Sequence, residues 1–113
     1  MHTLSLSVAW RAATTARALA AFAGEPQGAR LSFASVDLLW RVVNPKRLAI
    51  LRAMTGAGAL PIREVARRVG RDLEAVHGDV HALLDAGVVD LTDDGRVVFP
   101  YDAVRVAFDL PPA

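Results

Sequence analysis

Residues 61–100 contain the feature that most restricts how this chain can fold. Two segments with helix-like apolar spacing are separated by Gly70, and the second segment ends at Gly87. Two β-rich runs follow, joined through an Asp-Asp-Gly tripeptide at 93–95. Glycine is common in the left-handed turn that ends a helix, and Asp-Gly is typical of tight hairpin turns. The order of these signals predicts a helix, a tight turn, a second helix and a β-hairpin.

The apolar residues of both predicted helices recur at three- and four-residue intervals, as they do on one buried helix face. Pro61 is placed to open the first helix, and Asp72 is placed to cap the second. The predicted buried face of the first helix consists of Ile62, Val65, Ala66 and Val69. The predicted buried face of the second helix consists of Leu73, Val76, Val80, Leu83 and Leu84. Ala66 and Gly70 are small enough for two helices joined by so short a turn to cross closely.

The rest of the chain carries weaker signals. Ser35 is a favourable N-cap for one helix, and the pair Asn44-Pro45 predicts the start of another that ends near the glycines at 56–58. The Ala-rich stretch at 9–23 also predicts a helix. Short strands are predicted where β-rich or alternating residues occur: 3–8, 31–33, 88–91, 97–99 and 104–110.

These elements predict an α+β fold that is mainly α: a winged helix-turn-helix with a C-terminal β-hairpin wing and an N-terminal strand/helix arm. We expect residues 44–110 to form the winged helix-turn-helix domain. Residues 1–43 are expected to form a strand–helix–helix arm that serves in dimerisation. A small helix-turn-helix protein usually needs two copies to read two half-sites, which favours a homodimer. Leucines and aromatic residues of the arm are the predicted dimer interface: Leu4, Leu6, Trp10, Phe22 and Trp40.

The charges are distributed unevenly along the chain. Residues 1–71 contain eleven Lys/Arg and three acidic residues, a net charge of +8, whereas residues 72–113 have a net charge of −7. This asymmetry favours a basic surface for one partner and an acidic surface for another, unless folding mixes the two halves in space. The absence of cysteine excludes disulfides and thiolate metal ligands, and it is compatible with a cytoplasmic location. No apolar run is long enough to span a bilayer, and the charges within the N-terminal segment argue against a signal peptide.

The helix-turn-helix pattern indicates double-stranded DNA as a partner, because such a unit presents its second helix to the major groove. Arginines of the first helix would contact phosphates, and small residues on the outer face of the second helix would allow close approach to base edges. An arginine at the hairpin tip would reach an adjacent groove. The predicted DNA-binding residues are therefore Arg63, Arg67, Arg68, Arg71, Glu74, Ala75, Gly78, His81 and Arg96.

Two observations keep other functions open. Glu74, Asp79 and Asp85 lie on or near the second helix, and negative charge there would be repelled by DNA, which favours a protein-binding scaffold as the alternative. His77 and His81 are four residues apart, a spacing that can chelate zinc. The glutamate that a metalloprotease motif has between its histidines is missing, so an ordinary polar face is preferred over a metal site. We expect no cofactor, no metal and no enzymatic activity, because no nucleophile–base pair or phosphate-binding loop is visible.

Four runs of sequence resemble small prokaryotic winged-helix proteins of the MarR-like type: NPKRLAILRAM, PIREVARRVGRD, VHGDVHALLDAGVV and DGRVVFPYDAVRVAFDL. Members of this type are described as transcriptional regulators, and some are the antitoxin of a toxin–antitoxin pair. The resemblance covers residues 30–110 and implies DNA binding through the helix at 72–86 and the wing at 88–99. It implies autoregulation if the gene encodes an antitoxin.

The sequence thus predicts a sequence-specific DNA-binding transcriptional regulator that acts as a homodimer. The alternative is a protein-binding antitoxin that neutralises a cognate toxin without being primarily a DNA reader.

Overall fold

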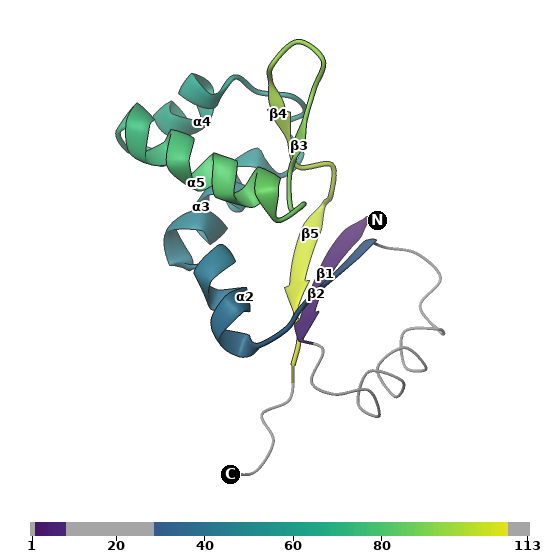
Figure 1. Cartoon of the computed structure of the whole chain (residues 1–113). Helices are drawn as coiled ribbons and strands as arrows, with labels where there is room; N and C mark the ends of the chain where they lie inside the picture. Colours follow the sequence, from purple (N-terminus) through teal and green to yellow (C-terminus); the bar gives the residue numbers. More distant parts are fainter. Residues whose placement is uncertain (1, 9–28, 109–113) are drawn as a thin grey trace.

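The computed structural model describes residues 2–8 and 29–108, which form an α+β fold (Figure 1). Within these residues there are four helices and two sheets. A three-stranded sheet lies toward one end of the molecule, and a group of helices with a small hairpin lies toward the other (Figure 1).

The larger sheet joins strands from opposite ends of the sequence. β1 (Thr3–Val8) lies in the middle, with β2 (Ala29–Phe33) on one side and β5 (Ala103–Val106) on the other. Both neighbours run parallel to β1, and Leu6 of β1 is in register with Leu31 of β2. Leucine and valine side chains of β1 alternate with serines, so that one face of the sheet is apolar and belongs to the core.

The prediction that residues 1–43 form a separate N-terminal arm is wrong. β1 is not an appendage, because it is hydrogen-bonded on both sides and Leu4 and Leu6 are fully buried within the chain. The sheet also connects residues 1–43 to residues 44–110, since β5 belongs to the second of these predicted regions. Alternation along a strand predicts one buried face, but it does not identify the neighbouring strands. The predicted helix at 9–23 lies outside the described residues.

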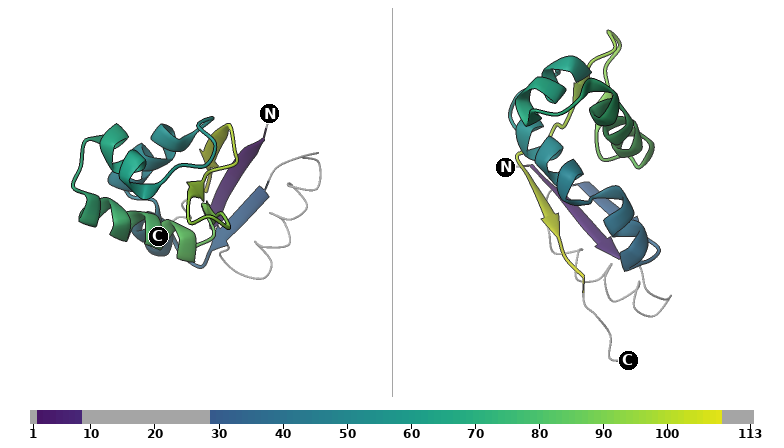
Figure 2. Two further views of the ribbon diagram at one scale, coloured as in Figure 1. Left: turned by 90° about the horizontal axis from the view of Figure 1, so that it is seen from above. Right: turned by 90° about the vertical axis from the view of Figure 1, so that its left-hand side faces the viewer.

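α2 (Val36–Val42) and α3 (Pro45–Met54) begin where the sequence predicts. The Oγ atom of Ser35 accepts a hydrogen bond at 3.1 Å from the backbone N–H three residues later. The Oδ1 atom of Asn44 caps α3 in the same way at 3.0 Å. α2 packs against β1 and β2, as the further views show (Figure 2). The two caps therefore fix where the chain leaves the sheet and enters the helical part.

α4 (Ile62–Val69) and α5 (Leu73–Asp85) pack against each other across a short turn. Gly70 ends α4 with φ of 67°, the left-handed conformation that glycine adopts without a steric penalty. The carboxylate of Asp72 accepts hydrogen bonds at 3.1 and 3.3 Å from two backbone N–H groups in the first turn of α5. The predicted order of a helix, a tight turn at Gly70 and a second helix is confirmed.

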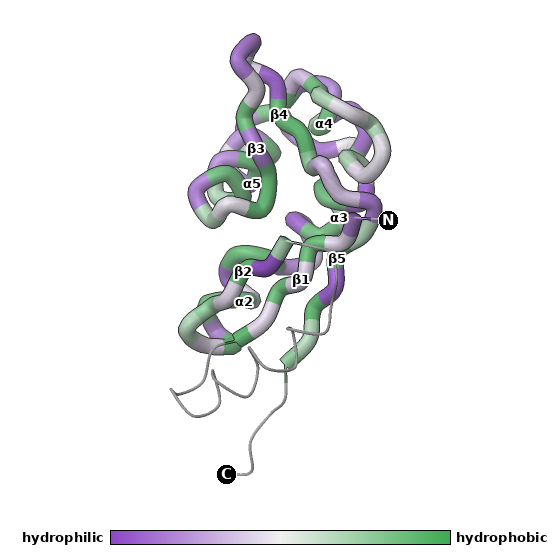
Figure 3. The backbone as a smooth tube through the Cα atoms, turned by 90° about the vertical axis from the view of Figure 1, so that its right-hand side faces the viewer, coloured by the Kyte–Doolittle hydropathy of each residue, from purple (hydrophilic) through white to green (hydrophobic). Residues whose placement is uncertain are grey.

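β3 (Asp90–Leu91) and β4 (Val97–Val98) form an antiparallel hairpin after α5. Leu60, just before α4, forms an isolated antiparallel bridge to Val97 through two backbone hydrogen bonds of 2.8 Å. The hairpin is therefore attached to the start of α4, although the two segments are far apart in the sequence. Its tip is hydrophilic (Figure 3).

Three predicted strands are longer than the observed ones. Val88 and Val89 are buried but precede β3, because their backbone N–H groups are directed to the carbonyl oxygen of Leu83 and so close the end of α5. β4 ends at Val98, and β5 spans 103–106, shorter than the predicted 104–110. Of that range, residues 109–110 lie outside the described part.

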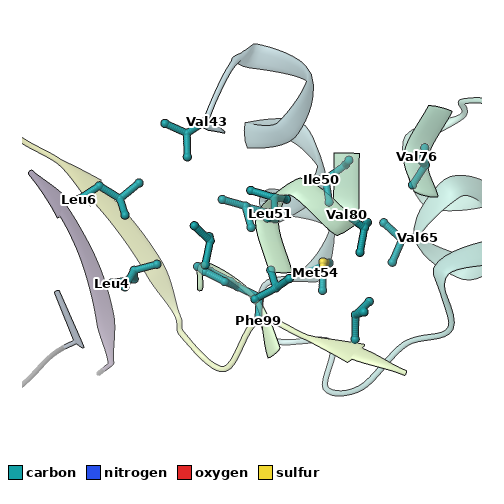
Figure 4. Packing of buried hydrophobic residues seen from close by; sticks show 14 of the residues in the cluster. Leu4, Leu6, Val43, Ile50, Leu51, Met54, Val65, Val76, Val80 and Phe99 are labelled. Carbon is teal, nitrogen blue, oxygen red and sulfur yellow. The ribbon is translucent and has the colours of Figure 1, made fainter. Parts of the chain in front are cut away.

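One continuous core joins the sheet to the helices (Figure 4). Val65 of α4 and the valines of α5 meet at one end of it, and the leucines of β1 lie at the other (Figure 4). The largest fully buried side chains come from every layer: Leu4, Leu6, Leu39, Val43, Ile50, Leu51, Met54, Val65, Val76, Val80, Leu83 and Val88. This packing holds α5 with one face inward and the opposite face outward.

Candidate nucleic-acid interface

The outward face of α5 is the first part of the candidate site. Glu74, Ala75, His77, Gly78 and His81 are all exposed, whereas the core-facing valines of the same helix are fully buried. Residues 74, 78 and 81 are spaced three and four apart, so they form one ridge on the helix surface. Four of these five residues were predicted to contact DNA, and the structure places them together on a solvent-facing ridge. We call these five residues the α5 ridge.

The predicted buried face of α5 is wrong at Leu73. Its side chain is 51% exposed, whereas Val76, Val80 and Leu83 are fully buried and Leu84 is partly buried. Helical side chains tilt toward the N-terminus, so the first side chain of α5 projects beyond the core that begins one turn later. Leu73 also lines a shallow depression with Asp72, Glu74 and His77. An exposed apolar side chain therefore lies at the start of the α5 ridge.

Arg71 was predicted to reach DNA, but it is held inside the chain by Asp79. Its Nη2 atom lies 2.8 Å from Asp79 Oδ2, and Asp79 Oδ1 accepts a hydrogen bond of 3.0 Å from Arg47 Nε. The three side chains are mostly buried, at 24%, 15% and 19% exposure for Arg71, Asp79 and Arg47. The Nη1 atom of Arg47 also donates to the carbonyl oxygens that end α2, at 2.6 and 3.2 Å. This ion cluster joins the end of α2, the start of α3, the α4–α5 turn and α5.

The ion cluster keeps Asp79 ionised. Burial by itself raises the pKa of Asp79, but the hydrogen bond from Arg47 and the positive charges of Arg47 and Arg71 outweigh burial and lower this pKa below its ordinary value. The cluster is therefore a structural tie rather than a free basic patch. Neither Asp79 nor Arg71 contributes an unpaired charge to the α5 ridge.

Arg67 and Arg68 share one carboxylate, that of Glu64. Arg67 donates two hydrogen bonds to Glu64, of 2.7 and 2.6 Å, and Arg68 donates one of 2.9 Å. These hydrogen bonds and charges lower the pKa of Glu64 to about 2. The side chain of Arg67 is nevertheless 72% exposed, so it can meet a second anion. Arg63, one turn earlier on α4, is exposed and makes no ion pair within the described part of the chain.

Arg96 lies at the tip of the hairpin, as predicted, and half of its side chain is exposed. Its Nε atom lies 3.3 Å from Asp94 Oδ2. Asp94 also accepts a hydrogen bond from Thr92, and this bond is the main cause that lowers the pKa of Asp94. The tip therefore carries a locally paired charge on a hydrophilic loop.

The α5 ridge itself is not basic. α5 contains no Lys or Arg, and its exposed carboxylates are Glu74 near the start and Asp85 at the end. The imidazole rings of His77 and His81 lie 4.2 Å apart between centroids. Within residues 2–8 and 29–108, no group of three or more His, Cys, Asp or Glu side chains is arranged to hold a metal ion. The positive charge of the candidate interface therefore comes from α4, which packs against α5, and not from the α5 ridge or from the hairpin, where Arg96 is accompanied by Asp90, Asp93 and Asp94.

The residues predicted to form a dimer interface differ in their exposure to solvent. Leu4 and Leu6 belong to the core of the single chain and offer no surface to a partner. Trp40 on α2 is 43% exposed and contacts Phe108 in a T-shaped arrangement with centroids 6.1 Å apart. Trp10 and Phe22 lie outside the described residues.

The described residues define an α+β protein in which four helices accompany a parallel three-stranded sheet and a small hairpin. The chain belongs to the HVO_A0114 family, whose sequence model matches residues 42–106. This match covers α3, α4, α5, the hairpin and β5. Searches of curated proteins and of solved structures found no match. None of the described helices is both long enough and apolar enough to cross a membrane.

Three features of the site were not predicted from the sequence. The spacing of Glu64 and Arg68 is the four-residue interval of helical ion pairs, so that pair was detectable. The Arg47–Asp79 contact joins residues 32 positions apart and had no local signal. The exposure of Leu73 could not be predicted from spacing alone, because Leu73 lies three residues before Val76 and so fits the apolar spacing of the buried stripe.

Proposed function

We propose that the protein is a sequence-specific DNA-binding transcriptional regulator that acts as a homodimer through a winged helix-turn-helix at residues 44–99. The observation that carries the proposal is the exposed α5 ridge on a helix that packs against α4, where Arg63 and Arg67 are exposed. α5 would lie in the major groove, and Arg63 and Arg67 would contact the phosphates that border it. The MarR-like resemblance is part of this proposal.

The order of the elements supports a winged helix-turn-helix. α3, the bridge at Leu60, α4, the left-handed turn at Gly70, α5 and the β3–β4 hairpin follow one another as such a unit requires. The bridge from Leu60 to Val97 adds a third extended segment to the hairpin, which fixes the proposed wing against the start of α4.

The electrostatics support phosphate contact at the border of the ridge. Arg63 is exposed, and Arg67 keeps N–H groups that do not bond to Glu64. Arg68 is half-buried toward α3, and Arg71 is committed to the ion cluster. The proposed phosphate contacts are therefore carried mainly by Arg63 and Arg67, with Arg96 of the hairpin as an outer contact.

The test is a salt titration of DNA binding by the double variant Arg63→Ala/Arg67→Ala. Removing two phosphate contacts lowers the affinity for every duplex and reduces the slope of log K against log salt by about one to two units. Arg68 remains to pair with Glu64, so α4 keeps an ion pair. Fluorescence anisotropy with a labelled duplex measures both quantities.

The matched control is Arg105→Ala, which removes an exposed arginine from β5 in the three-stranded sheet, outside the helices of the proposed interface. We expect its affinity and salt slope to equal those of the wild type. Unchanged binding in the double variant, or an equal loss in the control, would remove this mode of docking.

The second candidate function is a protein-binding antitoxin that neutralises a cognate toxin. The observation that favours it is the acidic character of the exposed side of α5, where Glu74 and Asp85 are exposed and the helix has no Lys or Arg. Such a surface suits a basic partner protein. Copurification with the product of a neighbouring gene, together with no shift of any DNA duplex, would favour this candidate over DNA binding.

A further inference from the structure

We propose that the start of α5 reads a thymine next to a cytosine in each half-site, through Leu73 and Glu74. This inference rests on the proposed function and specifies the bases that the first turn of α5 would select. It is carried by two adjacent exposed side chains of opposite chemistry at the end of α5 nearest the α4 arginines.

Leu73 is suited to one feature of the major groove. Its side chain is 51% exposed and lines the shallow depression at the start of α5. The C5-methyl group of thymine is the apolar group that base pairs present in this groove. Contact with that methyl group would remove apolar surface from water on both sides, which no other base edge offers to a leucine.

Glu74 is suited to a different base. Its exposed carboxylate makes no hydrogen bond or ion pair within the described residues, and an ionised carboxylate can only accept hydrogen bonds. Guanine and thymine present acceptor atoms in the major groove, so they would repel it. Adenine presents a donor beside an acceptor, whereas cytosine presents its N4 amino donor without a neighbouring acceptor. Cytosine is therefore the base that this carboxylate fits best.

The geometry joins the two preferences. Leu73 and Glu74 are consecutive in the first turn of α5, where Asp72 caps the helix through its own carboxylate. The cap uses only the Oδ2 atom of Asp72, whereas Leu73 and Glu74 take no part in it with their side chains. Ala75 follows with a small side chain that lets this end of the helix approach the groove. Two neighbouring pyrimidines are thus the expected contact.

The experiment selects duplexes from a randomised library with the wild type, Leu73→Ala and Glu74→Gln, and sequences the enriched DNA. The wild type should enrich an adjacent thymine and cytosine in each half-site. Leu73→Ala should lose the thymine, and Glu74→Gln should exchange the cytosine for adenine, because glutamine pairs with the N6 and N7 atoms of adenine. Replacing that thymine by uracil should lower wild-type affinity roughly fourfold, the contribution of one buried methyl group, and leave Leu73→Ala unaffected.

Two control variants use residues outside the proposed contact. Asp85→Asn removes a carboxylate at the far end of α5, and Leu91→Ala removes from β3 a leucine that is more exposed than Leu73. Both should select the wild-type sequence. Enriched sites without this dinucleotide, or variants that select the same bases as the wild type, would overturn the inference while leaving DNA binding intact. Failure of the wild type to enrich any sequence would overturn the proposed function, and the inference with it.

Discussion

At the scale of single residues, Asp79 has the largest predicted effect on stability. Asp79→Ala leaves the guanidinium groups of Arg47 and Arg71 mostly buried without their carboxylate partner. Loss of one partner from such a cluster should lower the free energy of unfolding by about 2 to 4 kcal/mol. Urea denaturation monitored by circular dichroism measures this change. Asp85→Ala, an exposed carboxylate on the same helix, should change stability by less than about 0.5 kcal/mol.

Asp79→Ala should also alter the pH dependence of the free energy of unfolding. The pKa of Asp79 is lower in the folded chain than its ordinary value of 3.8. Its stabilising contribution is therefore complete above the ordinary value and is lost as the pH falls through the lower, folded value. The wild type should lose stability more steeply than Asp79→Ala as the pH is lowered below about 4. Parallel curves for the two proteins would contradict the assignment of Asp79 to the ion cluster.

At the scale of helices and strands, the sequence predicts what depends on neighbouring residues. The caps at Ser35, Asn44 and Asp72 and the left-handed turn at Gly70 follow from residue type and position, and all four are confirmed. The parallel pairing of β1 with β5 was not predictable, because it joins opposite ends of the chain and alternation does not identify a partner. The α5 ridge was predictable from spacing, whereas its ion partners depend on contacts between distant segments.

The turn between α4 and α5 carries the prediction at this scale. Gly70 has φ of 67° and open space where a Cβ atom would lie, so Gly70→Ala meets no clash but must adopt a left-handed conformation. We expect a loss of about 1 to 2 kcal/mol in the free energy of unfolding. Gly78→Ala is the matched control, because Gly78 also has open space around it but lies within α5. That substitution should stabilise the fold by about 0.5 to 1 kcal/mol. Equal effects at the two glycines, measured by thermal unfolding, would contradict the role of the turn.

At the scale of the whole molecule, the described surface leaves one aromatic side chain suited to self-association. Trp40 is 43% exposed, and its ring rests on Phe108 near the end of β5. Leu4 and Leu6 are unavailable because they fill the core. If the protein is a homodimer as proposed, this surface of α2 is where the structure leaves room for the contact, and none of the five residues of the α5 ridge belongs to α2. Such an arrangement would leave both ridges free for two half-sites.

Sedimentation at micromolar concentration tests this arrangement. Sedimentation should give the wild type twice the 12.1 kDa mass of one chain and should give Trp40→Ala the mass of a single chain. The reason is that a few buried aromatic side chains contribute most of the binding energy of an interface. Leu91→Ala, which removes an exposed leucine from β3, should remain dimeric. The loss of the dimer should also weaken binding to a duplex with two half-sites far more than binding to a duplex with one, because only the dimer holds both ridges on the same DNA. A wild type that sediments as one chain, or a Trp40→Ala variant that stays dimeric, would exclude this surface of α2 as the interface.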